Sequence, residues 1–191
     1  SQVQTQQVIV NPIPTSDFNM PTIVCEGDLV QITYTGTAST SAGFAWDFGG
    51  GQLISGSGAG PYTIQWLTDG PKTVCLQVEE NGCISTLTCN NISILEPPSA
   101  GITPEANQCF AGNSFNFQYT GDANVTSYAW TFGADAVPAT SSDPAPPAVS
   151  YLNTGTKTVS LVVTRDGCVS DTAQITFDVI PDPVAQFSFS S

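Results

Sequence analysis

The residues best equipped for chemistry are six cysteines, because a thiol can form a disulfide, bind a metal or act as a nucleophile. They stand at positions 25, 75, 83, 89, 109 and 168 of a chain of 191 residues that contains no histidine. Zinc is disfavoured, because there is no Cys-x-x-Cys spacing and no histidine to complete a ligand set. Disulfide chemistry is therefore expected, and the cysteine count alone leaves the pairing open.

The remaining polar residues give no catalytic arrangement. Without histidine, neither a Ser-His-Asp nor a Cys-His nucleophile can be built. Glu79 and Glu80 are adjacent, and neighbours on a strand point to opposite faces, so we expect solvated hairpin charges rather than a catalytic pair. The glycine-rich residues 49–60 lack the Lys-Ser or Lys-Thr of a phosphate-binding loop and predict a flexible loop between strands. We therefore predict that the chain is not an enzyme.

Calcium is the one cofactor that the carboxylates could hold. They are scattered over both halves of the chain, without the dense Asp-x-Asp-x-Asp run of a calcium loop. A solvated acidic surface is the preferred interpretation, so no cofactor is expected, and calcium is the alternative. The carboxylates considered are Asp17, Glu26, Asp28, Asp47, Asp69, Asp122, Asp135, Asp143 and Asp178.

An internal repeat with a period of about 85 residues organises the chain. Tyr34-Thr35-Gly36 recurs as Tyr119-Thr120-Gly121, and the aromatic-Ala-Trp-x-Phe-Gly segment 44–49 recurs as 128–133. We place full repeats at 11–95 and 96–180, joined by short, semi-rigid, proline-rich junctions. Residues 1–10 match the last strand of a preceding repeat, and residues 181–191 match the first strand of a following one.

The repeat narrows the choice of disulfides. Cys25 corresponds to Cys109, and Cys83 corresponds to Cys168. Each repeat therefore contains one equivalent pair, which predicts the bridges Cys25–Cys83 and Cys109–Cys168. Cys75 and Cys89 flank Gly82 symmetrically on the two arms of a hairpin, which predicts a cross-strand bridge Cys75–Cys89. Such bridges favour an oxidising compartment, so the chain is expected to be secreted or on a cell surface.

Alternating apolar and polar runs bounded by Gly, Pro, Asn and Asp predict β-strands along the whole chain. Leu29–Tyr34, Thr73–Val78 and Thr158–Val163 are examples, and no segment has a convincing helical period. Asn81-Gly82 and Asp166-Gly167 predict tight hairpin turns. About seven strands per repeat fit an immunoglobulin-like sandwich. The predicted fold is all-β, with two tandem, disulfide-stapled β-sandwiches.

Aromatic residues mark the expected core. Trp46 and Phe48 in the first repeat, and Trp130 and Phe132 in the second, are predicted to pack between two sheets. A sugar-stacking surface is the alternative for the two tryptophans. Trp66 has no tryptophan partner in the second repeat, which favours a local or surface role. No ligand-binding residue can be named, although the loops 49–60 and 138–147 differ most between the repeats and are the first place to expect a specific contact.

Acidic residues dominate the charge: sixteen face three basic residues, and the formal net charge is −13. Too few cations are present to neutralise phosphates, so neither nucleic acid nor an anionic membrane surface is an expected partner. No apolar run approaches the ~20 residues of a membrane-spanning helix, so direct membrane insertion is not expected. The expected partners are neighbouring repeats of the same chain, and other cell-surface proteins or polysaccharides are further candidates.

These segments resemble the PKD domain, an immunoglobulin-like module. The family pattern aromatic-x-Trp-x-Phe-Gly-Asp-Gly corresponds to residues 44–51 and 128–135, and its Gly-x-Tyr-x-Val strand to residues 70–74 and 155–159. Two departures stand out. The turn Asp of the family is Gly50 in the first repeat and Ala134 in the second, and Lys72 and Lys157 replace the tyrosine.

The variant with an early Cys and a Gly-Cys corner is similar to tandem repeats of giant Bacteroidetes-type surface proteins, which are exported by type IX secretion. The resemblance implies spacer repeats of a long extracellular adhesin or surface filament that mediates adhesion or cell contact. A carbohydrate- or protein-binding module and an accessory domain of a secreted hydrolase are the alternatives. Asp171-Thr172-Ala173 resembles the short O-glycosylation motif of such proteins, so Thr172 is a candidate glycosylation site.

Overall fold

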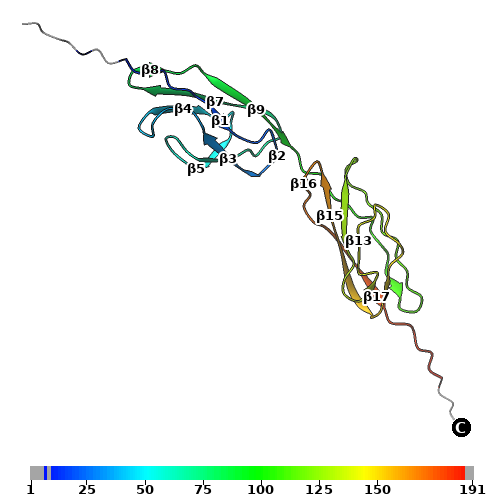
Figure 1. The fold of residues 1–191 in the computed structure, drawn as a ribbon. Helices are drawn as coiled ribbons and strands as arrows, with labels where there is room; N and C mark the ends of the chain where they lie inside the picture. Colours follow the sequence, from blue (N-terminus) through cyan, green and yellow to red (C-terminus); the bar gives the residue numbers. More distant parts are fainter. Residues whose placement is uncertain (1–6, 8–9, 188–191) are drawn as a thin grey trace, which may run out of the picture. The chain divides into compact units, whose positions relative to one another are not determined.

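A computed structural model describes residue 7 and residues 10–187, and within these ranges all regular structure is β-strand (Figure 1). The chain divides into two compact units, Ser1–Glu96 and Pro97–Ser191. This division lies next to the predicted boundary between residues 95 and 96. The predicted strand at 1–10 falls almost wholly outside the described residues. Residues 181–187, the described part of the predicted final strand, have no strand partner here and remain irregular.

Unit 1 is a sandwich of two sheets. One sheet has the order β1 (Phe18–Asn19), β3 (Leu29–Tyr34), β6 (Tyr62–Gln65) and β5 (Gln52–Ser55). The other has the order β2 (Ile23–Cys25), β9 (Thr88–Leu95), β7 (Gly70–Glu80) and β4 (Gly43–Asp47), and β8 (Cys83–Ile84) adds to β7. The prediction of a flexible loop at residues 49–60 is therefore partly wrong, because Gln52–Ser55 form an edge strand between the glycines.

Side-chain alternation on the strands builds the core of unit 1. On β7, Val74, Leu76 and Val78 are fully buried, while Thr73, Gln77 and Glu79 between and beside them are exposed. The same alternation on β3 and β9 buries Val30, Ile32, Ile92 and Ile94. Each such side chain contributes about 1.5–3 kcal/mol when it leaves water, so the period-two pattern specifies which face of each sheet turns inward.

Unit 2 repeats this architecture with a longer main sheet. Its strands are β10 (Gln108–Cys109), β11 (Ser127–Thr131), β12 (Ala136–Val137), β13 (Thr140–Ser141), β14 (Ser150–Tyr151), β15 (Gly155–Arg165), β16 (Cys168–Val169) and β17 (Ala173–Ile180). The main sheet has the order β10-β17-β15-β11-β13, with β16 paired to β15. The opposite sheet is reduced to the β12–β14 pair and two isolated bridges, Ile102↔Tyr119 and Phe115↔Val149. These bridges are equivalent to Phe18↔Tyr34 and Val30↔Ile64 of unit 1, so the repeat predicted from the sequence is also a repeat of register.

Both predicted hairpin turns are confirmed. Asn81 and Gly82 have φ values of 51° and 77°, and Asp166 and Gly167 have 52° and 87°. Two successive residues with positive φ are characteristic of the type I′ turn, which matches the twist of the strands that it joins. After each turn a buried serine fixes the returning strand, because the Ser85 hydroxyl accepts a hydrogen bond from the Val78 amide and Ser170 accepts one from Val163.

The recurring Tyr-Thr-Gly segment forms a corner in each unit. The Tyr34 hydroxyl donates to the Thr15 carbonyl, and the Tyr119 hydroxyl lies at 2.7 Å from the Asp122 carbonyl oxygen. A Cβ atom at Gly36 would lie 2.4 Å from the Tyr34 hydroxyl, so only glycine leaves room for the ring. The pattern recurs because it ties the first strand segment to the sheet.

Candidate functional site at the ends of each repeat

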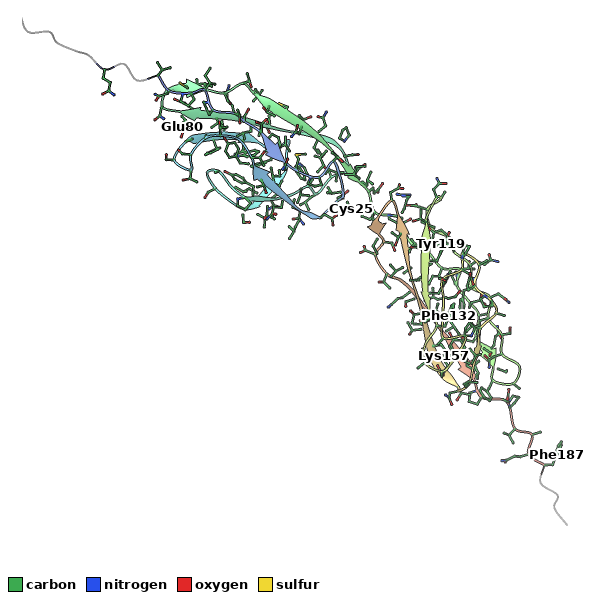
Figure 2. The ribbon with its side chains drawn as sticks, viewed as in Figure 1. Cys25, Glu80, Tyr119, Phe132, Lys157 and Phe187 are labelled. Atoms are coloured by element: carbon green, nitrogen blue, oxygen red, sulfur yellow. A yellow bond between two sulfur atoms is a disulfide. The ribbon has the colours of Figure 1, made fainter. Side chains whose placement is uncertain are left out.

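In unit 1 the two repeat-related cysteines lie at opposite ends of the sandwich. Cys25 ends β2 and pairs with Leu95, the last residue of β9, beside Gly70 at the start of β7. Cys83 pairs with Glu80 at the far end of β7. Figure 2 shows Cys25 and Glu80 at the two ends of unit 1. The Cys83 thiol also contacts the Asn11 carbonyl, where the chain enters the unit, at 3.7 Å.

The predicted bridge Cys25–Cys83 is therefore wrong. The 11 residues of β7 separate the two levels of the sheet, which corresponds to about 33 Å at ~3.3 Å per residue. A disulfide requires Cα atoms within about 7 Å. Cys83 is a free thiol. The repeat correctly matches each cysteine with its counterpart in the other repeat. It does not show that the long strand β7 holds Cys25 and Cys83 apart within one repeat.

Unit 2 has the same geometry, and the predicted bridge Cys109–Cys168 is wrong for the same reason. Cys109 pairs with Ile180, the last residue of β17, and Cys168 pairs with Arg165 at the opposite end of β15. Cys109 is an exposed free thiol. Cys25 and Cys168, by contrast, are both disulfide-bonded.

The predicted bridge Cys75–Cys89 is confirmed. The two residues are directly opposite each other on β7 and β9, as their symmetric spacing about the turn implied. In unit 2 the equivalent cross-strand pair is Ser160 and Gln174, so this bridge belongs to one repeat only.

Replacing both cysteines by serine is expected to destabilise unit 1 by about 3 kcal/mol, because the bridge closes a loop of about 15 residues in the unfolded chain. The measurement is denaturant unfolding of the double variant Cys75→Ser/Cys89→Ser, followed through the indole signals of Trp46 and Trp66. Unit 2 is the internal control, because its midpoint, followed through Trp130, should not move. An unchanged midpoint for unit 1 would contradict the prediction.

The core aromatic residues differ between the units. Trp130 and Phe132 are each 1% exposed and lie in the core of unit 2 as predicted, and the Trp130 indole donates to the Asp143 carbonyl. Trp46 and Phe48 are half-buried and pack stacked against each other on the edge of the core of unit 1. The core role is thus confirmed, with a more peripheral position in the first repeat.

The prediction of a local or surface role for Trp66 is wrong. Trp66 is 2% exposed, and its indole donates to the Phe48 carbonyl. Tyr151 takes the equivalent place in unit 2, where its hydroxyl donates to the Phe132 carbonyl. The sequence signal was present, since an aromatic residue with a polar tip stands at both positions, but a comparison by residue type alone missed it.

Unit 2 contains a buried ion pair that the sequence did not predict. Lys157, only 8% exposed, bonds the Asp135 carboxylate at 2.5 Å, and its ammonium group lies 5.4 Å from the centre of the Tyr151 ring. The hydrogen bond from Lys157 lowers the pKa of Asp135, and desolvation, followed by the charge of Asp135, raises the pKa of Tyr151 to about 12. Lys72 of unit 1 instead bonds the Thr68 hydroxyl. Lys157, which replaces the tyrosine of the PKD pattern, thus pairs with Asp135, the residue after Ala134 in the turn.

The other candidate residues do not converge. Within residues 10–187, no group of three or more acidic or cysteine side chains gathers where it could hold a metal ion, so the carboxylates considered for calcium lie apart. Thr172 is exposed just before β17, and its glycosylation stays a prediction. A groove in unit 2 includes Tyr128, Thr131, Pro138, Ser141, Asp143 and Pro147, which places it at the variable loop.

In each unit an early strand, β2 or β10, pairs in parallel with the last strand. In unit 1, β2 runs beside β9 in the register Ile23↔Ser93, and the ladder is extended by the bonds from Ser93 to Thr22 and from Glu26 to Leu95. In unit 2, β10 runs beside β17, and Phe110 donates to the Ile180 carbonyl. The rest of each sheet is antiparallel. In both units the last strand therefore lies side by side with β2 or β10, and the chain enters the early strand and leaves the last strand at opposite ends of the pair.

Comparison with known proteins found similar chains among solved structures only. No protein-family model matches the sequence, and no curated protein matches it. Among solved structures, the PKD1 domain of the Vibrio cholerae metalloprotease PrtV is 34% identical, with 44% of this chain and 98% of that domain covered and a TM-score of 0.34. The titin I-band fragment I67–I69 is 10% identical over 90% of this chain and 66% of that chain, with a TM-score of 0.43. The insect immune protein hemolin is 11% identical over 88% of this chain and 47% of that chain, with a TM-score of 0.44.

The chain is built from immunoglobulin-type β-sandwiches. This assignment rests on the two-sheet topology of each unit. Disulfide-bonded sandwiches of this class are typical of extracellular proteins. In the described part of the chain, no helix is present that could cross a bilayer.

Proposed function

We propose that the two repeats are structural spacer modules of a long extracellular adhesin or surface filament, and that they transmit tension along the chain. The observation that carries this proposal is the parallel pairing of β2 with β9 and of β10 with β17. The giant surface proteins of Bacteroidetes type, to which the repeats are similar, are the proposed parent class. The repeats are proposed to have no catalytic role of their own.

The direction of loading gives the parallel pair its importance. When the termini are pulled apart, β2 is drawn towards its N-terminus and β9 towards its C-terminus. In a parallel pair these forces slide the strands past each other, so all the ladder hydrogen bonds carry load together. In an antiparallel pair of terminal strands, both forces would act at one end and open the bonds one by one. A unit of this design is expected to resist extension.

Single-molecule stretching of the chain from its two termini tests the proposal in a Cys25→Ser/Cys168→Ser background, because the disulfide bonds of these two cysteines would otherwise carry the load in place of the ladders. Glu26→Pro removes the amide that donates to Leu95 at 2.8 Å, whereas Glu26→Ala keeps it. The proline variant should unfold unit 1 at a clearly lower force than the wild type, and the alanine variant should not. The events can be assigned, because the Cys75–Cys89 bridge withholds 14 residues, about 50 Å of extended chain, from the length released by unit 1.

A variant with a distant lesion separates mechanical from thermodynamic effects. Ser85→Ala leaves the Val78 amide without its buried acceptor at the other end of β7 and should cost about 1–3 kcal/mol at equilibrium. It should lower the unfolding force less than Glu26→Pro does. Equal forces for all variants, or extension of the wild type without a resolved unfolding event, would contradict the spacer function.

A binding module is the second candidate, and the groove of unit 2 favours it. The exposed β11 residues Ala129 and Thr131 line this groove together with the loop that differs most between the repeats. Titration of the labelled chain with soluble oligosaccharides should then shift the amide signals of Ser141 and Asp143. No shift at millimolar concentration would argue against a carbohydrate ligand. The metalloprotease origin of the PKD1 domain also keeps an accessory role beside a secreted hydrolase open to test by the neighbouring sequence.

A further inference from the structure

The two free thiols of the described residues lie where the array would continue. Cys83 lies at the N-terminal end of unit 1, against the Asn11 carbonyl. Cys109 lies at the C-terminal end of unit 2, on β10 beside Ile180. Close by, the Ala111 amide donates to the Asp182 carboxylate, which holds the departing chain against this end. The two thiols therefore lie at the end where the chain enters unit 1 and at the end where it leaves unit 2.

Their counterparts show what these positions can do. Cys168 has the same register as Cys83, opposite the residue that precedes the hairpin turn, and Cys25 has the same register as Cys109, opposite the last residue of the final strand. Both counterparts are disulfide-bonded. Each of the two positions is thus compatible with a disulfide in one copy of the repeat, while the distance along the central strand excludes a partner at the opposite end of the same sandwich.

We propose that Cys109 forms a disulfide with the N-terminal-end cysteine of another such repeat, the position that Cys83 occupies here. The partner is therefore a further PKD-like repeat with a Gly-Cys corner, for which a second copy of this chain stands in. This inference rests on the proposed function, because a head-to-tail bridge needs repeats that meet end to end. An unpaired, accessible cysteine in an exported protein is itself a signal of pairing outside the chain segment at hand.

The bond forms by thiol–disulfide exchange with a small-molecule disulfide such as oxidised glutathione. The Cys109 thiolate attacks one glutathione sulfur and releases one glutathione thiolate. The Cys83 thiolate of the second copy then attacks the protein sulfur of the mixed disulfide and releases the other. Two protein thiols lose two protons and two electrons, and one glutathione disulfide is reduced to two thiols.

The experiment mixes two single variants, Cys83→Ser and Cys109→Ser, at equal concentration in a glutathione redox buffer. The first retains only Cys109 as a free thiol, and the second retains only Cys83. Distinct mass tags identify each chain in the dimers, and peptide mapping locates the bridge. Both substitutions are isosteric changes at positions that are not fully buried, so both variants should fold, which the unchanged Cys75–Cys89 peptide verifies.

The expected result is a heterodimer bridged Cys83–Cys109, in about tenfold or greater excess over either homodimer, because end-to-end docking raises the effective concentration of the matched pair. The wild type should form a ladder of multimers through the same bridge. Statistical pairing, or a dominant Cys109–Cys109 dimer, would overturn the proposal. The stretching experiment is independent of this outcome. If the units resist shear but the cysteines pair statistically, the proposed bridge is contradicted and the mechanical role stands. If the cysteines pair selectively but the units do not resist shear, the mechanical role is contradicted and the bridge stands.

Discussion

Replacing Phe115 with alanine is expected to destabilise unit 2 by about 3–5 kcal/mol. Phe115 is fully buried and lies at the centre of an aromatic cluster. Its ring centre is 4.4 Å from that of Phe177 and 5.6 Å from that of Tyr151. Its backbone also makes the isolated bridge to Val149, where regular pairing of the second sheet is sparse. Side-chain packing rather than a hydrogen-bond ladder must therefore hold this sheet in place.

Denaturant unfolding followed by NMR measures the effect separately in each unit, since Trp130 reports on unit 2 and Trp46 and Trp66 report on unit 1. Phe110→Ala is the matched control, because Phe110 is 38% exposed and its backbone bond to Ile180 does not involve the ring. It should change the stability by no more than about 0.5 kcal/mol. If the two variants lower the midpoint of Trp130 equally, the aromatic cluster is not the main support of the sheet.

The fold followed from the sequence wherever a local pattern determined it. Leu29–Tyr34 is a strand with the predicted bounds, and the two Asn-Gly and Asp-Gly turns have the positive φ values that such turns require. What the sequence missed is non-local. The edge strand Gln52–Ser55 has no alternating burial and exists because β6 offers it a partner. Trp66 is buried because Phe48 supplies an acceptor across the sandwich.

The cysteines show the same division between local and long-range information. Cys75 and Cys89 were paired correctly because a hairpin turn between them fixes the register. Cys25 and Cys83 were paired by equivalence between repeats, which says which residues share a role but nothing of their distance. The 11-residue strand β7 determines that distance. Because the two repeat-related cysteines lie at the two ends of the sandwich, equivalence in the sequence does not predict a bridge within one repeat.

In the ion pair of unit 2, removing the carboxylate is expected to cost more stability than removing the lysine, because the lysine is the more deeply buried partner. Asp135→Asn should cost about 3 kcal/mol or more, because it leaves the ammonium group of Lys157, 8% exposed, without a counter-charge. Lys157→Met should cost only about 1 kcal/mol, because Asp135 is 28% exposed and can take water instead. Lys72→Met, at the equivalent position of unit 1, is the matched control and should change stability by less than about 0.5 kcal/mol. Equal losses for the two partners would contradict this asymmetry.

The pH dependence of the same pair gives a second readout. The hydrogen bond from Lys157 lowers the pKa of Asp135 in the folded state, so its contribution is complete above the unfolded pKa of about 3.9. It is lost as the pH falls through the lower, folded pKa. Hydrogen bonds from Ser99 also lower the pKa of Asp122. Asp122 is present in every variant, so its contribution cancels when the variants are compared. Between pH 7 and pH 2, unit 2 of the wild type should therefore lose more stability than unit 2 of Asp135→Asn, and parallel curves would show that Lys157 does not stabilise the ionised carboxylate.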